Sequence, residues 1–335
     1  MPKILLLTTG GTIASVPTKE GLAPGLGAQQ LLSYVPAVTE KAEIIPKQLL
    51  SLDSTNLQPE HWITMATEIY QSLPHYDGIV VTHGTDTMAY TAAALSFMLP
   101  DVPLPVVLTG AQIPIHDPQS DGPKNLTDAL LVAMAGHPGI SLVFNGQIIK
   151  GCRASKIDTV NFDAFASINY PPIGFIKDGK VHFAQDIKST CLQRNAQLDT
   201  KLDQRVLLLK LVPGLNPAIV TALPQLGFKG LVIEGFGNGG VPFYGKHNLL
   251  PAVQEVISKG VQVVVSTQCL NGGTHLELYE VGRKTAALGA LSGHDMTTEA
   301  LVTKLMWVLG HTTEPAEVKK MMLHNYCEEI SYPSQ

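Results

Sequence analysis

Three short segments of this chain carry side chains that could hydrolyse a bond through a threonine nucleophile. They are Leu7–Ala14 (LTTGGTIA), Thr82–Met88 (THGTDTM) and Arg153–Lys156 (RASK). In each, an apolar run gives way to small or charged residues, as at the carboxyl end of a parallel strand, where ligands bind. A hydroxyl nucleophile needs a base and donors for the developing oxyanion. The nucleophile, relay and base can be supplied, without a cofactor, by Thr12, Thr85, Asp86 and Lys156.

Each of these residues also has a structural interpretation. The glycines Gly10-Gly11 permit a tight turn close to a ligand, but Thr12 could instead cap the next segment. Thr85 or Asp86 could cap the following helix, which is compatible with catalysis because a helix N-terminus also favours an anionic ligand. Lys156 alone would be a surface lysine, although a lysine held in a dry site beside a carboxylate can act as a base or relay.

Three other motifs need an interpretation. The run Asp53-Ser54-Thr55-Asn56 suits helix capping, yet its hydroxyls and backbone N–H groups could also hold a small carboxylate. The segment Gly235–Gly240 fits the dinucleotide-binding spacing GxGxxG, but Val241-Pro242-Phe243 follows it in place of a helix. We therefore interpret Gly235–Gly240 as a loop. We interpret His83 as a structural histidine rather than a general base.

The composition excludes several classes of protein. The chain has 335 residues and is 45% hydrophobic and 15% charged, so it can form one large or two ordinary domains. A net charge of −5 without a basic cluster argues against a nucleic-acid-binding surface. The cysteines are far apart and form no CxxC pair, which favours free thiols in a reducing compartment over metal binding; they are Cys152, Cys191, Cys269 and Cys327. The eleven histidines show no HExxH pairing, so we expect no metal.

The amino terminus predicts a buried strand rather than a targeting segment. Its apolar run, Ile4–Leu7, is shorter than the roughly 7–15 apolar residues of a signal peptide. No apolar run approaches the ~20 residues of a membrane span. We therefore expect a cytoplasmic protein.

Continuous apolar runs alternate with helical patterns in the first half of the chain. The runs are typical of strands covered on both faces: Ile4–Leu7, Gly78–Val81, Val106–Leu108 and Ser141–Phe144. The predicted helices are Pro59–Leu73, Met88–Leu99 and Leu126–Ala135. This alternation predicts a doubly wound, mostly parallel α/β sheet. The Gly- and Pro-bearing stretch Ala14–Gly27 lacks a core pattern and predicts a mobile lid or binding loop.

A polar stretch near residues 184–204 interrupts the pattern. The alternation then restarts, with strands expected at Val206–Leu211, Gly230–Ile233 and Val261–Val265 and helices at Pro251–Ser258, Thr298–Leu309 and Glu314–His324. We therefore predict an N-terminal α/β catalytic domain at 1–184, a linker at 185–205 and a smaller C-terminal α/β domain at 206–335.

Taken together, these segments resemble the bacterial-type L-asparaginases, specifically their cytoplasmic type I branch. The resemblance covers nearly the whole chain and is carried by TGGTIA, HGTDTMAYTAAALSFML, GAQIP, DAFASINYPP and STQC. It implies a larger N-terminal and a smaller C-terminal α/β domain. It also implies a homo-oligomer, either a dimer or a tetramer, that hydrolyses L-asparagine to L-aspartate and ammonia.

The resemblance implies a role for each polar residue of the three segments. Thr12 matches the threonine that forms an aspartyl ester with the substrate. Thr85, Asp86 and Lys156 match the group that activates the water resolving that ester. Covalent catalysis of this kind divides amide hydrolysis into two easier steps.

The resemblance also implies how the substrate is held. Asp53, Ser54 and Thr55 match the segment that binds its α-carboxylate, and Asp86 meets its α-ammonium. The amide carbonyl would face backbone donors near Thr85. A zwitterionic amino acid needs both kinds of partner, and these segments contain both.

Two positions depart from the family pattern. Many members carry a loop tyrosine that orients or deprotonates the nucleophile, and Leu22 occupies its place here, so the first-step base stays open. Some type I enzymes bind asparagine at a regulatory site through an arginine and a TQC segment. Thr267-Gln268-Cys269 matches that segment, but Glu234 stands at the place of the arginine.

Three rival functions remain at this point. A glutaminase-asparaginase would turn over both amides. The amidase component of an archaeal tRNA-dependent amidotransferase uses a similar site but carries an extra N-terminal domain, whereas this chain begins at its first strand. A non-catalytic asparagine- or aspartate-binding module would be expected to lose one of the four reactive residues, and all four are present.

Overall fold

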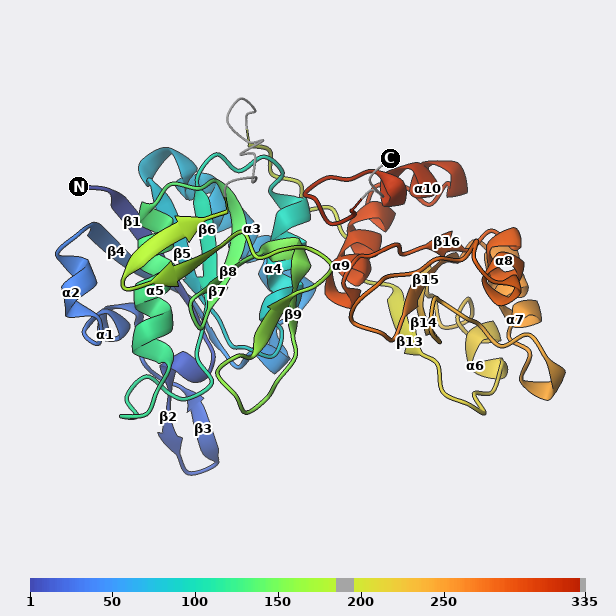
Figure 1. Cartoon of the computed structure of the whole chain (residues 1–335), viewed down its shortest axis with the longest axis horizontal. Coiled ribbons are helices and arrows are strands. Elements are labelled where there is room, and N and C mark those ends of the chain that lie inside the picture. Colours follow the sequence, from blue (N-terminus) through green and yellow to red (C-terminus); the bar gives the residue numbers. More distant parts are fainter. Residues whose placement is uncertain (185–195, 332–335) are drawn as a thin grey trace. The chain divides into compact units, whose positions relative to one another are not determined.

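The chain forms two compact units, Met1–Thr200 and Lys201–Gln335 (Figure 1). The computed structural model describes residues 1–184 and 196–331, so Cys191 and most of the predicted linker lie outside the described residues. Residues 196–205 contain no helix or strand. Asp199 donates its backbone N–H to Met98 in the first unit, and Asp203 donates to Met306 in the second.

An eight-stranded sheet organises the first unit. Its order is β12-β11-β8-β7-β6-β5-β1-β4. Pairing is parallel from β7 through β6, β5 and β1 to β4, and antiparallel among β7, β8, β11 and β12. The strands are β1 Lys3–Gly10, β4 Glu43–Leu52, β5 Gly78–Thr82, β6 Pro105–Thr109, β7 Gly139–Phe144, β8 Gln147–Lys150, β11 Gly174–Lys177 and β12 Lys180–Phe183. The sheet is therefore mixed but mostly parallel, as predicted.

The four strands predicted from continuous apolar runs are β1, β5, β6 and β7. Every residue of β5 and β6 is buried, which explains why both faces of these strands are apolar. Strand β4 was not predicted. It lies at the sheet edge, is mostly half-buried or exposed, and contains Pro46 and Lys47, residues that protect an edge strand from pairing with another chain.

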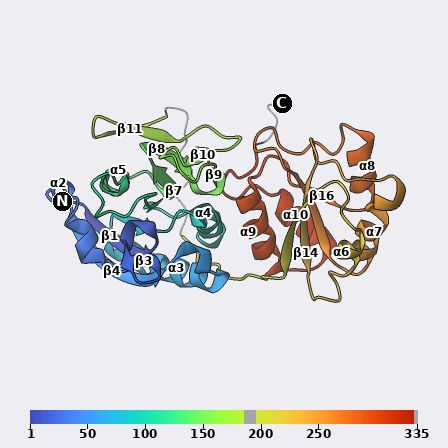
Figure 2. The same cartoon turned by 90° about the horizontal axis from the view of Figure 1, so that it is seen from below.

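Helices cover both faces of this sheet (Figure 2). Helix α5 (Gly122–Met134) lies on one face with the shorter α1 (Ala28–Leu32) and α2 (Pro36–Thr39), and α3 (Pro59–Ser72) and α4 (Met88–Met98) lie on the other. The α5 face buries a core that includes Ile4, Leu6, Val80, Val107 and Leu126. The doubly wound architecture predicted from the sequence is confirmed.

The strand order creates a topological switch point at β1. The chain first pairs β4 on one side of β1 and then places β5 on the other side. The connections that follow β1 and β5 therefore diverge to opposite sides and leave a crevice at the carboxyl ends of these two strands. Ligands of open α/β sheets bind at such a crevice.

The second unit contains a smaller parallel sheet. Its order is β13 (Val206–Lys210), β14 (Gly230–Gly235), β15 (Gln262–Thr267) and β16 (Leu291–Ser292). Residues of α6 (Ala218–Thr221) and α7 (Leu250–Ser258) pack with one face of the sheet. Helix α9 (Thr298–Leu309) packs closely on Gly230 of β14 through Leu305 and Leu309. Two further helices are α8 (Glu280–Ala287) and α10 (Pro315–Leu323).

The structure corrects the prediction of a loop at Ala14–Gly27. Strands β2 (Ser15–Thr18) and β3 (Gly21–Pro24) pair there as an antiparallel hairpin. Each strand has four residues and β3 has no buried residue, so neither leaves an apolar run in the sequence. The Thr18 hydroxyl donates to the Gly21 carbonyl at 2.6 Å and closes the turn. A second antiparallel pair joins β9 (Ala154–Lys156) and β10 (Phe165–Ser167).

Within residues 1–184 and 196–331, no helix has the length and apolar character needed to cross a membrane. The three described cysteines, Cys152, Cys269 and Cys327, are free thiols. The same residues contain no cluster of three or more His, Cys, Asp or Glu side chains that could hold a metal ion.

Candidate active site

The turns that follow β1 and β5 lie in direct contact at the switch point. A Cβ atom on Gly11 would lie 2.3 Å from the Cα atom of Gly84, so both positions must be glycine for the backbones to approach this closely. Gly11 also has a φ of 77°, which favours glycine. Thr12 is the first residue of a short 3-10 helix after this turn, and the N-cap of that helix is Gly11. The contact places Thr12 beside the segment that carries Thr85.

The segment after β4 contacts both of these turns at the crevice. A Cβ on Gly84 would lie 2.6 Å from the Oγ of Ser54, and the Thr87 hydroxyl donates to the Ser54 carbonyl at 2.7 Å. Ser54 is 2% exposed. Gly11 donates its N–H to the Leu52 carbonyl at 2.9 Å. Three segments far apart in the sequence therefore meet within a few ångströms.

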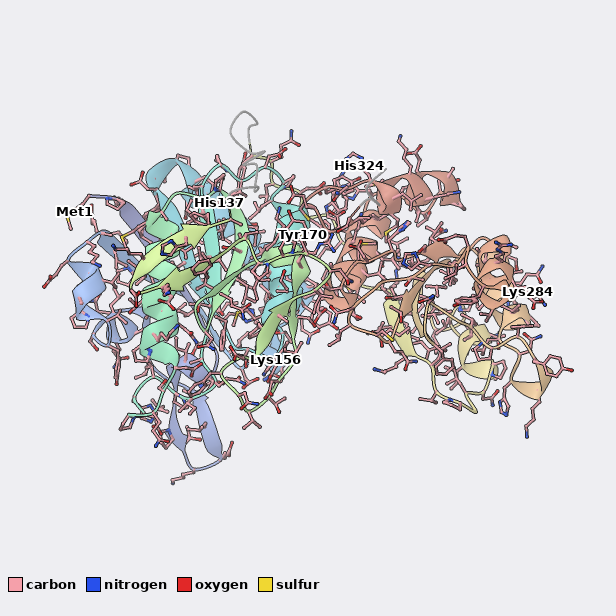
Figure 3. The ribbon with its side chains drawn as sticks, viewed as in Figure 1. Met1, His137, Lys156, Tyr170, Lys284 and His324 are labelled. Carbon is pink, nitrogen blue, oxygen red and sulfur yellow. The ribbon has the colours of Figure 1, made fainter. Side chains whose placement is uncertain are left out.

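Lys156 connects two of the predicted reactive residues. Its Nζ donates to the Thr85 Oγ at 2.8 Å and to an Asp86 carboxylate oxygen at 2.7 Å. Lys156 is the last residue of β9 (Figure 3), and its side chain is 15% exposed, whereas that of Asp86 is 54% exposed. Asp86 is not the N-cap of α4, because that residue is Thr87, whose side chain makes no capping bond. The capping interpretation of Asp86 is therefore wrong.

The capping interpretation does hold for Asp53. It is the N-cap of the 3-10 helix Ser54–Asn56, and its Oδ1 accepts both the N–H and the hydroxyl of Thr55, at 2.9 and 2.7 Å. We call Thr12, Ser54, Thr85, Asp86 and Lys156 the threonine site. Asp53 and Thr55 flank this site and shape the turn that presents Ser54.

His83 is a buried neutral histidine behind the threonine site. Its Nδ1 donates to the Gly84 carbonyl at 2.7 Å, and its Nε2 accepts from the Thr91 hydroxyl at 2.8 Å. Thr91 in turn accepts from the Trp62 indole at 3.1 Å. Burial lowers the pKa of His83 to about 4, and the Gly84 hydrogen bond only partly opposes this. These contacts agree with the interpretation of His83 as a structural residue.

Leu22 lies on the hairpin rather than in an irregular loop. It is the second residue of β3, pairs with Pro17 and is 59% exposed. Its side chain has no group that could accept a proton.

One side chain at the site was given no role in the sequence analysis. The Oε1 of Gln112 accepts from the Thr85 hydroxyl at 3.2 Å, and its Nε2 faces the carbonyls of Asp158 and Asn161 at 3.4 and 3.3 Å. Gln112 follows the carboxyl end of β6, the neighbour of β5. Its position after a parallel strand is the signal that could have identified it.

The residues considered for a regulatory site lie in the second unit, at the carboxyl ends of β14 and β15. The Glu234 carboxylate accepts from the Thr298 hydroxyl at 2.6 Å and lies 3.9 Å from Lys210 Nζ. Gln268 donates to the carbonyls of Leu211 and Glu234 at 2.7 and 3.0 Å. Thr267 donates to the Gly237 carbonyl and accepts from the backbone N–H of Cys269, which is exposed. Each of these groups is engaged within the chain, and a regulatory role stays a prediction.

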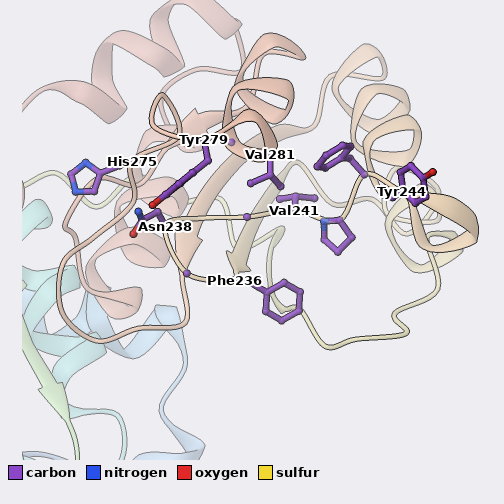
Figure 4. A pocket seen from close by; sticks show the side chains of 12 residues that line it. Phe236, Asn238, Val241, Tyr244, His275, Tyr279 and Val281 are labelled. Carbon is purple, nitrogen blue, oxygen red and sulfur yellow. The ribbon is translucent and has the colours of Figure 1, made fainter.

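The second unit also contains a cavity of about 580 Å³ (Figure 4). It is lined mainly by apolar and aromatic side chains of two loops and of the start of α8, namely Phe236, Val241, Phe243, Tyr244, Tyr279 and Val281, with Asn238 and His275 as polar members. The loop Gly235–Gly240 contributes to it and begins no helix. The dinucleotide interpretation of this glycine motif therefore gains no support.

Comparison with known proteins identifies the family. The model of the asparaginase N-terminal domain matches residues 3–189, and that of the glutaminase/asparaginase C-terminal domain matches residues 205–322. An L-asparaginase of Thermococcus kodakarensis is 44% identical over 330 residues, which cover 98% of this chain and 99% of that protein. One subunit of the glutamyl-tRNA(Gln) amidotransferase of Pyrococcus furiosus is 40% identical over 342 residues, covering 99% of this chain and 77% of that protein.

Solved structures give the same result. The thermostable L-asparaginase from Thermococcus kodakarensis superposes with a TM-score of 0.93 at 43% identity, over 99% of this chain and 100% of that one. A probable cytoplasmic L-asparaginase from Campylobacter jejuni superposes with a TM-score of 0.82 at 29% identity, over 97% and 100% of the two chains. With both family models matched in order and a relative 44% identical along its whole length, this chain belongs to the asparaginase family.

Proposed function

We propose that this chain is an L-asparaginase, which hydrolyses L-asparagine to L-aspartate and ammonia through an ester on Thr12. The observation that carries this proposal is the contact of Lys156 with both Thr85 and Asp86, beside the Thr12 turn at the sheet's switch point. The whole-length similarity to the L-asparaginase of Thermococcus kodakarensis supports the same activity.

In the first step, Thr12 is the nucleophile. Its hydroxyl oxygen bonds to the side-chain carbonyl carbon of asparagine, the carbon–nitrogen bond breaks, and the nitrogen leaves as ammonia with the threonine proton. The carbonyl oxygen becomes negative on the way and is stabilised by backbone N–H groups near Thr85. Position 22 of the hairpin does not supply the base, because a leucine cannot accept a proton.

In the second step, water resolves the ester. The water oxygen bonds to the ester carbon, the bond to the Thr12 oxygen breaks, and the proton lost by the water ends on Thr12. Thr85, Asp86 and Lys156 form the group that activates this water. The 2.8 Å and 2.7 Å contacts of Lys156 keep these side chains in one arrangement, which supports a joint role.

The substrate's two charged groups have matching partners. Asp86 is half exposed and directs one oxygen to Lys156, so its carboxylate can also receive the α-ammonium group. Ser54 begins the short helix after Asp53, and its hydroxyl suits the α-carboxylate. Asp53 organises this turn by accepting from Thr55.

The proposal predicts a preference between the two amides. Glutamine is longer than asparagine by one methylene, and size alone separates such substrates by roughly 10–200-fold. Because Asp86 and Ser54 fix the α-groups, the extra methylene pushes the glutamine amide past Thr12 and lowers turnover as well as binding. We expect kcat/KM to favour asparagine by at least about 100-fold.

Ammonia release from asparagine and glutamine over a concentration series tests the activity and the preference together. Thr12→Ala is expected to lose several orders of magnitude of turnover while keeping the wild-type circular dichroism. Retention of more than about a tenth of wild-type activity, roughly 1.4 kcal/mol of barrier, would remove Thr12 from the nucleophile role. Comparable efficiency on glutamine would instead assign the chain a glutaminase-asparaginase activity.

The similarity to the glutamyl-tRNA(Gln) amidotransferase favours a second candidate function. In that case, amide hydrolysis would supply ammonia to a reaction on glutamyl-tRNA and would depend on that partner. Measuring asparagine hydrolysis by the chain alone separates the two. Full turnover without tRNA supports the asparaginase, and an absolute requirement for charged tRNA supports the amidotransferase role.

We also propose a cytoplasmic homo-oligomer, either a dimer or a tetramer. The compartment is supported by the similarity to a probable cytoplasmic L-asparaginase, and the assembly by the resemblance to the type I branch. Analytical ultracentrifugation of the purified chain measures the assembly directly.

A further inference from the structure

Gln112 touches the threonine site without belonging to the reactive residues assigned above. Its side-chain oxygen forms a hydrogen bond with the Thr85 hydroxyl at 3.2 Å. Lys156 forms a separate hydrogen bond with the same hydroxyl. Thr85 is 5% exposed, so few other groups can reach its hydroxyl. The direction of the hydrogen bonds at Thr85 therefore depends on these two neighbours.

The orientation of the Gln112 amide is fixed by two backbone carbonyls. The carbonyls of Asp158 and Asn161 lie 3.4 and 3.3 Å from Nε2, and a carbonyl only accepts hydrogen bonds. A flipped amide would set its oxygen against both of them. The nitrogen therefore faces these carbonyls, and the oxygen faces Thr85.

This orientation determines where the Thr85 proton points. The ammonium of Lys156 can only donate, so the Thr85 oxygen accepts from it. The Thr85 proton is then directed to the Gln112 oxygen. A hydroxyl oxygen has two lone pairs, and one of them is left to accept from a third partner.

The backbone that carries Gln112 is held by a buried carboxylate. Asp121, which is 7% exposed, accepts the N–H of Gln112 at 3.0 Å and that of Ile113 at 3.1 Å. The same carboxylate accepts from the Asn125 side chain at 3.0 Å. Gln112 is thus fixed from its backbone at one end and from its amide at the other.

We propose that Gln112 is a positioning residue for the second step of the reaction. By holding the Thr85 proton, it turns the remaining lone pair of Thr85 toward the water that attacks the ester. The water donates one hydrogen bond to Thr85 and so presents its own lone pair to the ester carbon. No proton is transferred to Gln112, and the proton lost by the water ends on the Thr12 oxygen. The inference rests on the proposed asparaginase activity.

Two substitutions separate this role from a purely structural one. Gln112→Met keeps the length of the side chain but removes both the acceptor and the donor. Gln112→Glu keeps an acceptor for Thr85 and loses the donor to the Asp158 and Asn161 carbonyls. The matched control is Gln119→Met, an exposed position on the same connection after β6.

The decisive measurement is accumulation of the aspartyl ester. Purified variants are mixed with excess asparagine, quenched in acid within the first turnovers and weighed by intact-protein mass spectrometry. For Gln112→Met we expect a kcat about tenfold lower, roughly 1.4 kcal/mol of barrier, with a KM lower by a similar factor, so that kcat/KM stays close to wild type because formation of the ester is not slowed. We also expect the covalent intermediate to accumulate. Gln112→Glu and Gln119→Met should not accumulate it.

The inference is overturned if Gln112→Met resolves the ester at the wild-type rate. It is also overturned if Gln112→Glu accumulates the ester as strongly as Gln112→Met. Loss of the hydrogen bonds from Nε2 to the Asp158 and Asn161 carbonyls would then explain the accumulation in both variants. The proposed function fails separately, when the wild type releases no ammonia from asparagine or Thr12→Ala keeps its activity.

Discussion

Each unit of the chain contains a lysine–carboxylate pair, and the two pairs differ in how the lysine is surrounded. Lys304 and Glu329 in the second unit have fully buried side chains, and the lysine donates to Glu329 and to the carbonyls of Met322 and His324. Its three protons are all used. Lys156 in the first unit donates to Thr85 and Asp86 and is 15% exposed, beside a carboxylate that is 54% exposed.

The carboxylates reflect the same contrast. Burial alone would raise the pKa of Glu329, but the charge and hydrogen bond of Lys304, together with backbone hydrogen bonds, outweigh burial and hold this pKa below its usual range. Glu329 thereby fixes the C-terminal segment by accepting from the backbone N–H groups of Tyr326 and Cys327. A lysine in a closed, saturated setting serves stability, whereas one that opens to a crevice and touches a hydroxyl is available for chemistry.

The largest expected effect separates activity from stability at Lys156. We expect Lys156→Met to lower kcat/KM for asparagine at least about a thousandfold, roughly 4 kcal/mol of barrier, because the Thr85 and Asp86 contacts are both lost. Its unfolding free energy should stay within about 1 kcal/mol of wild type, as expected for a pair that reaches solvent. Steady-state kinetics and urea unfolding measure the two quantities. If the unfolding free energy fell by as much as the barrier rises, Lys156 would serve stability as Lys304 does, and the two pairs would not differ in role.

The converse substitution is Lys304→Met. Removing one partner of a buried pair leaves an uncompensated charge, so we expect the free energy of unfolding to fall by about 3–5 kcal/mol. Activity per folded molecule should be close to wild type. Lys304→Met combined with Glu329→Gln should be more stable than the single substitution, because the orphaned charge is gone. A single variant as stable as wild type would contradict a structural role for this pair.

A third pair provides the control for both. Lys259 and Glu255 lie one helical turn apart, and each side chain is 44% exposed. Lys259→Met should change the unfolding free energy by only about 0.3–0.5 kcal/mol and leave turnover unchanged. Chemical denaturation of Lys259→Met and Lys304→Met under the same conditions would show whether the loss of unfolding free energy depends on how exposed the pair is.

A further prediction concerns pH and the buried His83. Its pKa is lowered by burial from 6.5 to about 4, so the unfolded chain binds a proton more readily than the folded chain. The contribution of the neutral, buried His83 to the free energy of unfolding is fully present above pH 6.5 and is lost progressively as the pH falls toward 4. Because the unfolded chain binds this proton more tightly than the folded chain, we expect the free energy of unfolding to fall by about 2 kcal/mol between pH 7 and pH 5. Urea unfolding at several pH values measures it.

His83→Gln is the matched variant for that series, because a glutamine can donate and accept hydrogen bonds but does not titrate in this range. Its stability should fall less steeply than that of the wild type between pH 7 and pH 5. Parallel curves for the two proteins would show that another group is responsible.

The sequence predicted the elements that are buried on both faces. Strands β5 and β6 and helix α4 lie within one or two residues of the predicted bounds, because their apolar runs are continuous. The exposed elements were missed. Strand β4 and the β2–β3 hairpin are stabilised by pairing with neighbours, and such contacts leave little trace in local composition.

The site followed the same pattern. Thr12, Thr85 and Asp86 follow strands whose carboxyl ends are recognisable in the sequence. Lys156 is the last residue of β9, a strand that was not predicted, and it does lie against Thr85 and Asp86. The sequence could not show that the amide of Gln112 reaches Thr85, because that contact depends on the neighbouring β5 and β6 and on the loop near Asp158. Nor could it distinguish capping at Asp53 from the absence of capping at Asp86, since both residues precede helices.

The switch point also determines when activity can arise. The Thr9 hydroxyl bonds the Thr82 carbonyl across 73 residues, and Lys156 bonds Thr85 across 71 residues. Loops of this length cost entropy to close, and parallel pairings of distant strands form slowly. During refolding, the circular dichroism of the helices should therefore return before ammonia release. A nascent chain that has emerged from the ribosome with Thr12 but without Lys156 cannot hydrolyse asparagine. Each molecule therefore becomes active only late in its synthesis and folding.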